Sequence, residues 1–216
     1  MIRLKFLTHF LLKKLKLHSN TIMKFNILFL VLLSFGVFAQ KPKMKKIFNG
    51  KNLKGWVIPD DKNCWTVENS LLKVQSEPSK KGSILWTEEK YQDFIIQVDF
   101  KMGEGRVDSG IFLKSELNQI QIGISGSLKR DMTASPYIIG KMYPKEAVTV
   151  KDILKPKDWN TMKVSVIGKS YKVWLNGIEV MDYTTESIPE IGPIGLQLHP
   201  GNEMAIDYKN LLVAKL

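Results

Sequence analysis

Alternation of apolar and polar residues along short segments is the feature that most limits what this 216-residue chain can fold into. In 93–101 every second residue is large and apolar, and Gln97 and Asp99 lie between these residues. Because successive side chains of a strand point to opposite faces, this spacing predicts a β-strand with one buried face. The alternation recurs over 162–166 and 171–175, and no segment after residue 39 keeps the spacing of an amphipathic helix. We therefore expect an all-β fold.

A hairpin is predicted at Asn176-Gly177, because both residues tolerate the positive φ angles of a tight turn and both flanking segments alternate. Shorter strands are predicted over 65–67, 71–74, 83–86, 110–114, 119–124, 194–199 and 204–213. Many short strands separated by turn signals indicate a single β-sandwich or jelly-roll domain. The segment 125–157 is expected to form long loops with one or two short strands, and long loops on a β scaffold often carry function.

The first 39 residues have the pattern of a Sec signal peptide. Met23-Lys24 precedes an uncharged apolar run over 25–38, and Val37-Phe38-Ala39 places small residues for cleavage before Gln40. An uncleaved N-terminal anchor is the alternative. We expect Met23 to be the natural start, residues 40–216 to form the exported domain, and the product to be periplasmic or secreted by a bacterium. After cleavage no membrane insertion is expected.

Charge and cysteine content exclude other classes of protein. All six charged residues among the first 39 are basic, and leaving them out lowers the formal net charge from +11 to +5. This modest excess does not favour nucleic-acid binding. A single Cys, Cys64, rules out an internal disulfide framework and a cysteine-cluster metal site.

Seven segments in order along the chain match motifs of one bacterial family. They are 47–56 (IFNGKNLKGW), 65–72 (WTVENSLL), 85–94 (LWTEEKYQDF), 108–114 (DSGIFLK), 158–161 (DWNT), 173–177 (VWLNG) and 192–199 (GPIGLQLH). Over 46–216 the chain thus resembles the 3-keto-disaccharide hydrolases, also described as 3-keto-glucoside 1,2-lyases and 3-keto-2-hydroxy-glucal hydratases. The resemblance implies a concanavalin A-like jelly roll.

The chain departs from the family pattern at acidic positions. The family strand Y-E-x-Q-I-L-D corresponds to 118–124, where Gln119 and Ile124 replace the acidic residues. The family pair D-H corresponds to Leu198-His199, so the imidazole remains without its acidic neighbour. The family's N-S-G-I-F-L-R reads DSGIFLK here. The chain represents a divergent branch, and inherited activity is a hypothesis.

The resemblance implies cleavage of a glycosidic bond in a sugar oxidised at C3. The keto group acidifies the C2 proton, a base removes it, the C1 substituent is eliminated, and addition of water completes a net hydrolysis. This chemistry needs a base near neutral pH, a donor for the enolate oxygen and an aromatic wall for the sugar. The alternative from a different class is a non-catalytic carbohydrate-binding jelly-roll domain. In both cases the expected partner is an oligosaccharide or glycoside.

His199, the only His after residue 39, is the predicted catalytic base or acid, because imidazole exchanges protons near neutral pH. A surface or structural His is the alternative. Arg130 and Asp131 are predicted to assist it, with Asp131 orienting Arg130 or replacing the missing carboxylate; a loop cap is the alternative for Asp131. No resident metal is predicted, although a divalent cation near His199, held by Glu203 and Asp207, stays open.

The predicted substrate-binding residues are of three kinds. Amides both donate and accept hydrogen bonds to sugar hydroxyls, cations bind enolate or hydroxyl oxygens, and aromatic rings stack on sugars. The residues are Gln119, Gln121, Gln197, Lys114, Lys129, Trp86 and Tyr137, with Tyr143 as a further aromatic. Their alternatives are a solvent-facing strand surface for the amides, a solvated basic face for the cations and core packing for the aromatics.

Overall fold

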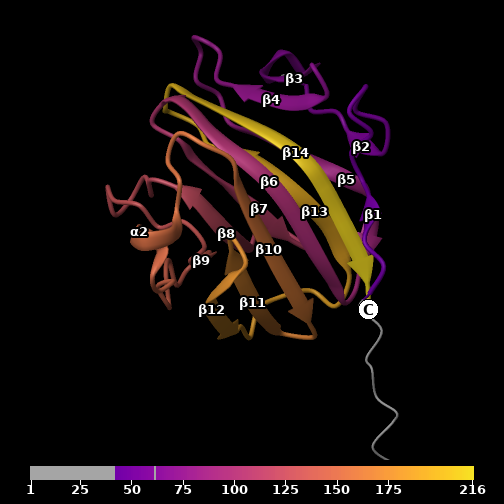
Figure 1. Ribbon diagram of the computed structural model, residues 1–216, viewed down its shortest axis with the longest axis vertical. Helices are drawn as coiled ribbons and strands as arrows, with labels where there is room; N and C mark the ends of the chain where they lie inside the picture. Colours follow the sequence, from indigo (N-terminus) through magenta and orange to yellow (C-terminus); the bar gives the residue numbers. More distant parts are fainter. Residues whose placement is uncertain (1–41, 61) are drawn as a thin grey trace, which may run out of the picture. The chain divides into compact units, whose positions relative to one another are not determined.

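Two antiparallel β-sheets make up the part of the chain that the computed structural model describes, residues 42–60 and 62–216 (Figure 1). The predicted signal peptide, its cleavage site and the start at Met23 lie outside these residues. Nearly all regular structure is β, which confirms the predicted all-β class. No helix of the described residues is long and apolar enough to cross a membrane.

The larger sheet has eight strands in the order β12-β11-β10-β6-β14-β4-β3, with β1 pairing along β14. Its strands are β1 (Lys45–Lys46), β3 (Trp65–Glu68), β4 (Leu71–Gln75), β6 (Phe94–Gly105), β10 (Asn160–Ile167), β11 (Ser170–Leu175), β12 (Ile178–Thr184) and β14 (Met204–Lys215). The predicted hairpin joins β11 to β12, and Asn176 and Gly177 have φ angles of 50° and 86°.

The smaller sheet has six strands in the order β2-β5-β13-β7-β8-β9. Its strands are β2 (Trp56–Val57), β5 (Ser83–Tyr91), β7 (Asp108–Leu113), β8 (Asn118–Gly123), β9 (Pro136–Ile138) and β13 (Gly192–Leu198). The remaining short elements are η1 (Lys62–Cys64) and α2 (Val150–Ile153). The segment 125–157, predicted to form loops with one or two short strands, contains the short strand β9 and also the four-residue helix α2, which was not predicted.

One apolar core lies between the sheets and follows from the alternation in the sequence. On β6, Phe94, Ile96, Val98 and Phe100 are at most 1% exposed. Leu85 of β5, which belongs to the six-stranded sheet, packs into the same core and is 0% exposed. Each large apolar side chain removed from water in this way contributes roughly 1.5–3 kcal/mol to stability.

The centre of the six-stranded sheet is covered on both faces. Every residue of β7 and of β8 is buried, including the polar residues Asp108, Gln119 and Gln121. Ile111 and Ile120 belong to the core, so the polar residues between such positions point to the other side of the sheet. A polar, sheltered surface therefore lies on the outward face of this sheet.

Candidate active site

A cleft of about 840 Å³ occupies the outward face of the six-stranded sheet. Strand residues form its floor, and the loop after β8 together with the turn after β13 forms its walls. The lining residues from the strands are Ser83, Ile84, Trp86, Asp108, Phe112, Gln119, Gln121, Tyr137, Gln197 and Leu198. From the loops and turns come Glu116, Ser125, Gly126, Ser127, Lys129, Tyr143, His199 and Asn202.

Strand register explains why these residues meet. Gly195 pairs with Trp86 on one side and with Phe112 on the other. Phe112 pairs in turn with Gln119, which pairs with Tyr137. Because paired residues point to the same face, this row crosses five strands and places its aromatic and amide groups side by side on the cleft floor.

Two amide groups of the floor, those of Gln119 and Gln197, are bonded to each other. Gln119 Nε2 donates to Gln197 Oε1 over 2.6 Å, although β7 runs between their strands. The crossing passes over Gly110, where a Cβ atom would lie 2.0 Å from Gln119 Nε2. Glycine at this position therefore lets the amide lie across the strand. Since the oxygen of Gln197 is used, its NH₂ group is the part left to donate to a ligand.

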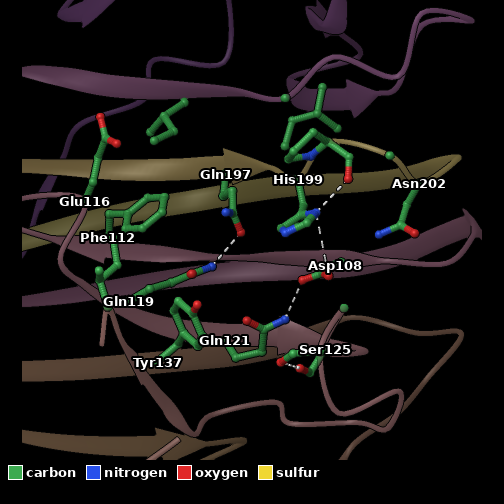
Figure 2. Close-up of a pocket in the computed structure, with 18 of the residues that line it drawn as sticks. Asp108, Phe112, Glu116, Gln119, Gln121, Ser125, Tyr137, Gln197, His199 and Asn202 are labelled. Atoms are coloured by element: carbon green, nitrogen blue, oxygen red, sulfur yellow. Dashed lines mark hydrogen bonds and ion pairs between the residues drawn. The ribbon is translucent and has the colours of Figure 1, made fainter. Parts of the chain in front are cut away.

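His199 follows the last residue of β13, and its side chain is 37% exposed. Its Nδ1 atom lies 2.7 Å from the carbonyl oxygen of Pro200. A carbonyl only accepts, so Nδ1 carries the proton and Nε2 keeps the lone pair of the neutral ring. Figure 2 shows the Nε2 edge turned towards the middle of the cleft. The imidazole is thus oriented to accept a proton from a bound molecule.

A buried carboxylate that sequence analysis did not identify lies beside this imidazole. The side chain of Asp108 is 3% exposed, and its Oδ2 atom lies 3.8 Å from His199 Nδ1 (Figure 2). Its Oδ1 atom accepts a hydrogen bond of 2.8 Å from Gln121 Nε2. Oδ2 has no hydrogen-bond partner among the described residues. The available signal was the first residue of DSGIFLK, where the family motif has Asn.

The loop after β8 closes over this end of the cleft. Arg106 Nη2 donates to the backbone oxygen of Ser125 over 2.9 Å, and Ser125 Oγ lies 3.0 Å from Ser127 Oγ. A Cβ atom on Gly126 would lie only 2.9 Å from Asp108 Oδ2. Glycine therefore allows the loop backbone to rest directly on the carboxylate.

Two aromatic pairs line the cleft. The ring centroids of Trp86 and Phe112 are 5.6 Å apart, and those of Tyr137 and Tyr143 are 5.2 Å apart. Burial, and to a smaller extent the charge of Asp108, raise the pKa of Tyr143 to about 12. The phenol is therefore neutral and able to donate at physiological pH. Flat apolar surfaces beside amides suit the rings and hydroxyls of a sugar.

Three predicted site residues do not line the cleft, so the predicted convergence of Arg130 and Asp131 on His199 is wrong. Arg130 is exposed and pairs with Glu146, and Asp131 Oδ1 accepts from the backbone N–H of Thr133 over 2.7 Å. Both residues line a separate pocket of about 300 Å³. Asp131 is a loop cap, the alternative weighed from the sequence.

Lys114 was predicted to bind an enolate or hydroxyl oxygen of the substrate, with a solvated basic face as the alternative. Its φ angle of 64° turns the chain at the end of the strand, so the alternation stops there. Its side chain is buried outside the cleft, and this burial lowers the pKa of the ammonium group. The other predicted residues, His199, Gln119, Gln121, Gln197, Trp86, Tyr137 and Lys129, all line the cleft.

No group of three or more His, Cys, Asp or Glu residues in the described part of the chain is arranged to hold a metal ion. Glu203, suggested as a cation ligand, is exposed. The polar groups of the cleft are instead amides, hydroxyls, one imidazole, the buried carboxylate of Asp108, and Glu116 and Lys129 at the rim.

The fold and cleft define a jelly-roll β-sandwich, an architecture shared by lectin domains among others. The sequence profile of the 3-keto-alpha-glucoside-1,2-lyase-like domain matches residues 43–214. The chain belongs to this family, as its motifs indicated. A comparison with curated protein sequences gives no match.

Solved structures share the fold at low sequence identity. A Parabacteroides distasonis protein described as a candidate glycosyl hydrolase is 21% identical, with a TM-score of 0.61 over 81% of this chain and 100% of that chain. The exoplasmic/lumenal domain of VIP36, in a Ca²⁺/Man3GlcNAc-bound form, is 13% identical, with a TM-score of 0.61 over 81% and 90%. The carbohydrate-binding module CBM66 from Bacillus subtilis is 15% identical, with a TM-score of 0.50 over 74% and 96%. These likenesses confirm the predicted jelly-roll sandwich.

Proposed function

We propose that the protein cleaves 3-keto-glycosides by removing the C2 proton, eliminating the C1 substituent and adding water to the resulting 2-hydroxy-glucal. The family supports this reading. The observation that carries it is the imidazole of His199, whose Nε2 edge faces a cleft of amides and aromatic rings. Such a site offers a base, hydrogen-bond donors and a wall for the sugar in one place.

Each group has a defined task in this reaction. His199 Nε2 takes the C2 proton, and the C–H electron pair passes into the enolate of the 3-keto group. The NH₂ group of Gln197, which lines the cleft two residues before His199, donates to the enolate oxygen. The enolate then expels the C1 oxygen, which receives its proton from the imidazolium. Addition of water across the new double bond yields the free 3-keto sugar.

The acidic residues of the cleft favour this route over ordinary glycoside hydrolysis. That reaction uses two carboxyl groups flanking the scissile bond. Here Asp108 and Glu116 line the cleft from opposite ends (Figure 2). Asp108 is also buried and bonded to Gln121. A single imidazole is therefore the best placed group for proton transfer.

A panel of 3-keto-glucosides, each paired with its unoxidised parent, tests the proposal. We expect release of the aglycone from the oxidised compounds only, with a transient 2-hydroxy-glucal detected by NMR spectroscopy. Assays with and without added divalent metal complete the panel. If no oxidised compound reacts under either condition, the proposal is wrong.

Carbohydrate binding without turnover is the second candidate, favoured by the three amides on the cleft floor, which can donate to and accept from sugar hydroxyls. The fold likeness to CBM66 and to a sugar-bound domain agrees with it. It predicts measurable affinity for a glycan by calorimetry together with no loss of that glycan over time. Turnover without measurable affinity for unoxidised glycans would contradict it.

We also propose that the protein works in the periplasm or outside the cell, because residues 1–39 have the pattern of a signal peptide. N-terminal sequencing of the exported protein is expected to begin at Gln40. Recovery of the uncleaved chain from the cytoplasm would overturn this proposal.

A further inference from the structure

We infer that Asp108 is a positioning residue for His199, supplying the negative charge that stabilises the imidazolium formed when Nε2 takes a proton. This inference rests on the proposed function. It assigns a role to a carboxylate that neither the family motifs nor the predicted site residues include. Three independent features of the structure support it: the missing partner of Oδ2, the geometry at Nδ1 and the close approach of Gly126.

The first feature is the unequal hydrogen bonding of the two carboxylate oxygens. Gln121 Nε2 donates to Oδ1 over 2.8 Å, whereas Oδ2 is buried without a partner among the described residues. A buried carboxylate oxygen without a partner is unfavourable. The fold therefore leaves at Oδ2 a buried acceptor that is open to a neighbouring donor or positive charge.

The second feature is the position of this oxygen relative to the imidazole. Oδ2 lies 3.8 Å from His199 Nδ1, the atom whose proton is already directed to the Pro200 carbonyl oxygen at 2.7 Å. The carbonyl fixes the tautomer, so the carboxylate is not needed for that purpose. Its charge matters only when the ring becomes positive, which is the state produced by removal of the C2 proton.

The third feature is the glycine above the carboxylate. Gly126 does not have a positive φ angle, so its backbone conformation does not require glycine. A Cβ atom there would lie 2.9 Å from Asp108 Oδ2 and 3.7 Å from His199 Cε1. The loop backbone thus covers Oδ2 and keeps water, which would screen the attraction, away from it.

Other charged or titratable groups near the pair are held elsewhere or remain exposed. Arg106, on the turn before β7, donates to the backbone of Ser125. Lys129 and Glu203, from the loop after β8 and the turn after β13, are exposed. Tyr143 is neutral, because burial raises its pKa to about 12. Among these groups, Asp108 is the one that is both charged and buried against the ring.

The variant Asp108→Asn tests the inference, because it removes the charge and keeps an oxygen to accept from Gln121. An opposite charge at this range typically changes proton affinity by roughly one to three powers of ten. We expect kcat for a 3-keto-glucoside to fall by about 10-fold to 100-fold with KM nearly unchanged. Glu203→Gln, which removes an exposed carboxylate four residues after His199, is the matched control and is expected to leave both constants unchanged.

A second readout does not depend on turnover. ¹⁵N NMR spectroscopy of the full chain follows protonation of the His199 ring, whose signals are identified by their loss in His199→Gln. We expect the protonation curve to move to lower pH in Asp108→Asn and to stay in place in Glu203→Gln. The added methyl group of Gly126→Ala would push the loop away from Oδ2. We expect this variant to move the protonation curve in the same direction as Asp108→Asn, but by a smaller amount.

The outcomes separate this inference from the proposed function. An unchanged protonation curve in Asp108→Asn overturns the inference, even if the enzyme is active. A rise in KM with kcat unchanged also overturns it, because the residue would then act in binding. A shifted curve in a protein that is inert on every 3-keto-glucoside supports the pairing of Asp108 with His199 and refutes the proposed reaction.

Discussion

The outward faces of the two sheets are built by the same alternation but hold their polar groups in opposite ways. On the eight-stranded sheet, Lys163 lies 4.2 Å above the Trp174 ring and Lys209 lies 3.8 Å above Trp159. These cations keep their charge at the surface. On the six-stranded sheet, Gln119 bonds to Gln197, and Gln121 bonds to the buried carboxylate of Asp108.

The difference lies in what covers each face. The loop after β8 and the turn after β13 enclose part of the six-stranded sheet and form the cleft. Polar groups taken out of water must find hydrogen-bond partners. Glutamine can both donate and accept, so it suits the covered face, whereas lysine suits the face that stays in water. A polar strand face therefore becomes a binding site only where loops cover it.

The largest expected difference between the faces concerns proton transfer. His199→Ala removes the proposed base and is expected to lower kcat/KM for a 3-keto-glucoside by about 10²-fold to 10⁴-fold. Lys163→Gln, on the face of the other sheet, is expected to leave kcat/KM unchanged. Steady-state kinetics measures both, and circular dichroism checks that both variants fold. Equal activity of His199→Ala and the wild type would show that His199 is not the catalytic base.

Glycine substitutions in the two sheets should separate binding from stability. Gly110→Ala places a Cβ atom 2.0 Å from Gln119 Nε2 and should displace that amide from Gln197. We expect about 1–3 kcal/mol of lost stability from the clash and a several-fold higher KM. Gly103→Ala on β6 meets Ala205 Cβ at 3.0 Å, so only stability should fall. Thermal unfolding and KM are measured on both, and a raised KM in Gly103→Ala would show that the contrast is not local to the cleft.

Tryptophans on the two faces provide a smaller test. Trp86 lies over Gly195 and beside Phe112 in the cleft, whereas Trp174 lies beneath Lys163. Loss of a ring contact in Trp86→Ala is expected to weaken binding of a sugar by about 1 kcal/mol, or roughly fivefold. Trp174→Ala should leave binding unchanged. Calorimetric titration with one glycan compares them, and equal losses would mean that neither ring defines the binding face.

The sheets and core followed from the sequence because period-two alternation and Asn176-Gly177 are local signals. The amides of the cleft were found for the same reason, since Gln119 and Gln121 share a face of one strand. Asp108 was missed because its role depends on how β7 lies beside the end of β13, which is set by the register between distant segments. Arg130 was misplaced because alternation does not apply within a loop.

The smallest expected effect is on stability at alkaline pH, and it tests whether Tyr143 is buried in the cleft. Burial raises the pKa of Tyr143 to about 12, above its usual value of 10.0. Because the folded-state pKa is the higher one, the stabilising contribution of the neutral phenol is complete below pH 10 and is lost as pH rises towards 12. Tyr143→Phe cannot ionise, so its free energy of unfolding should fall slightly less than that of the wild type over this range. Urea denaturation at several pH values measures the difference, and parallel curves would show that Tyr143 is as hydrated as a residue on the opposite sheet.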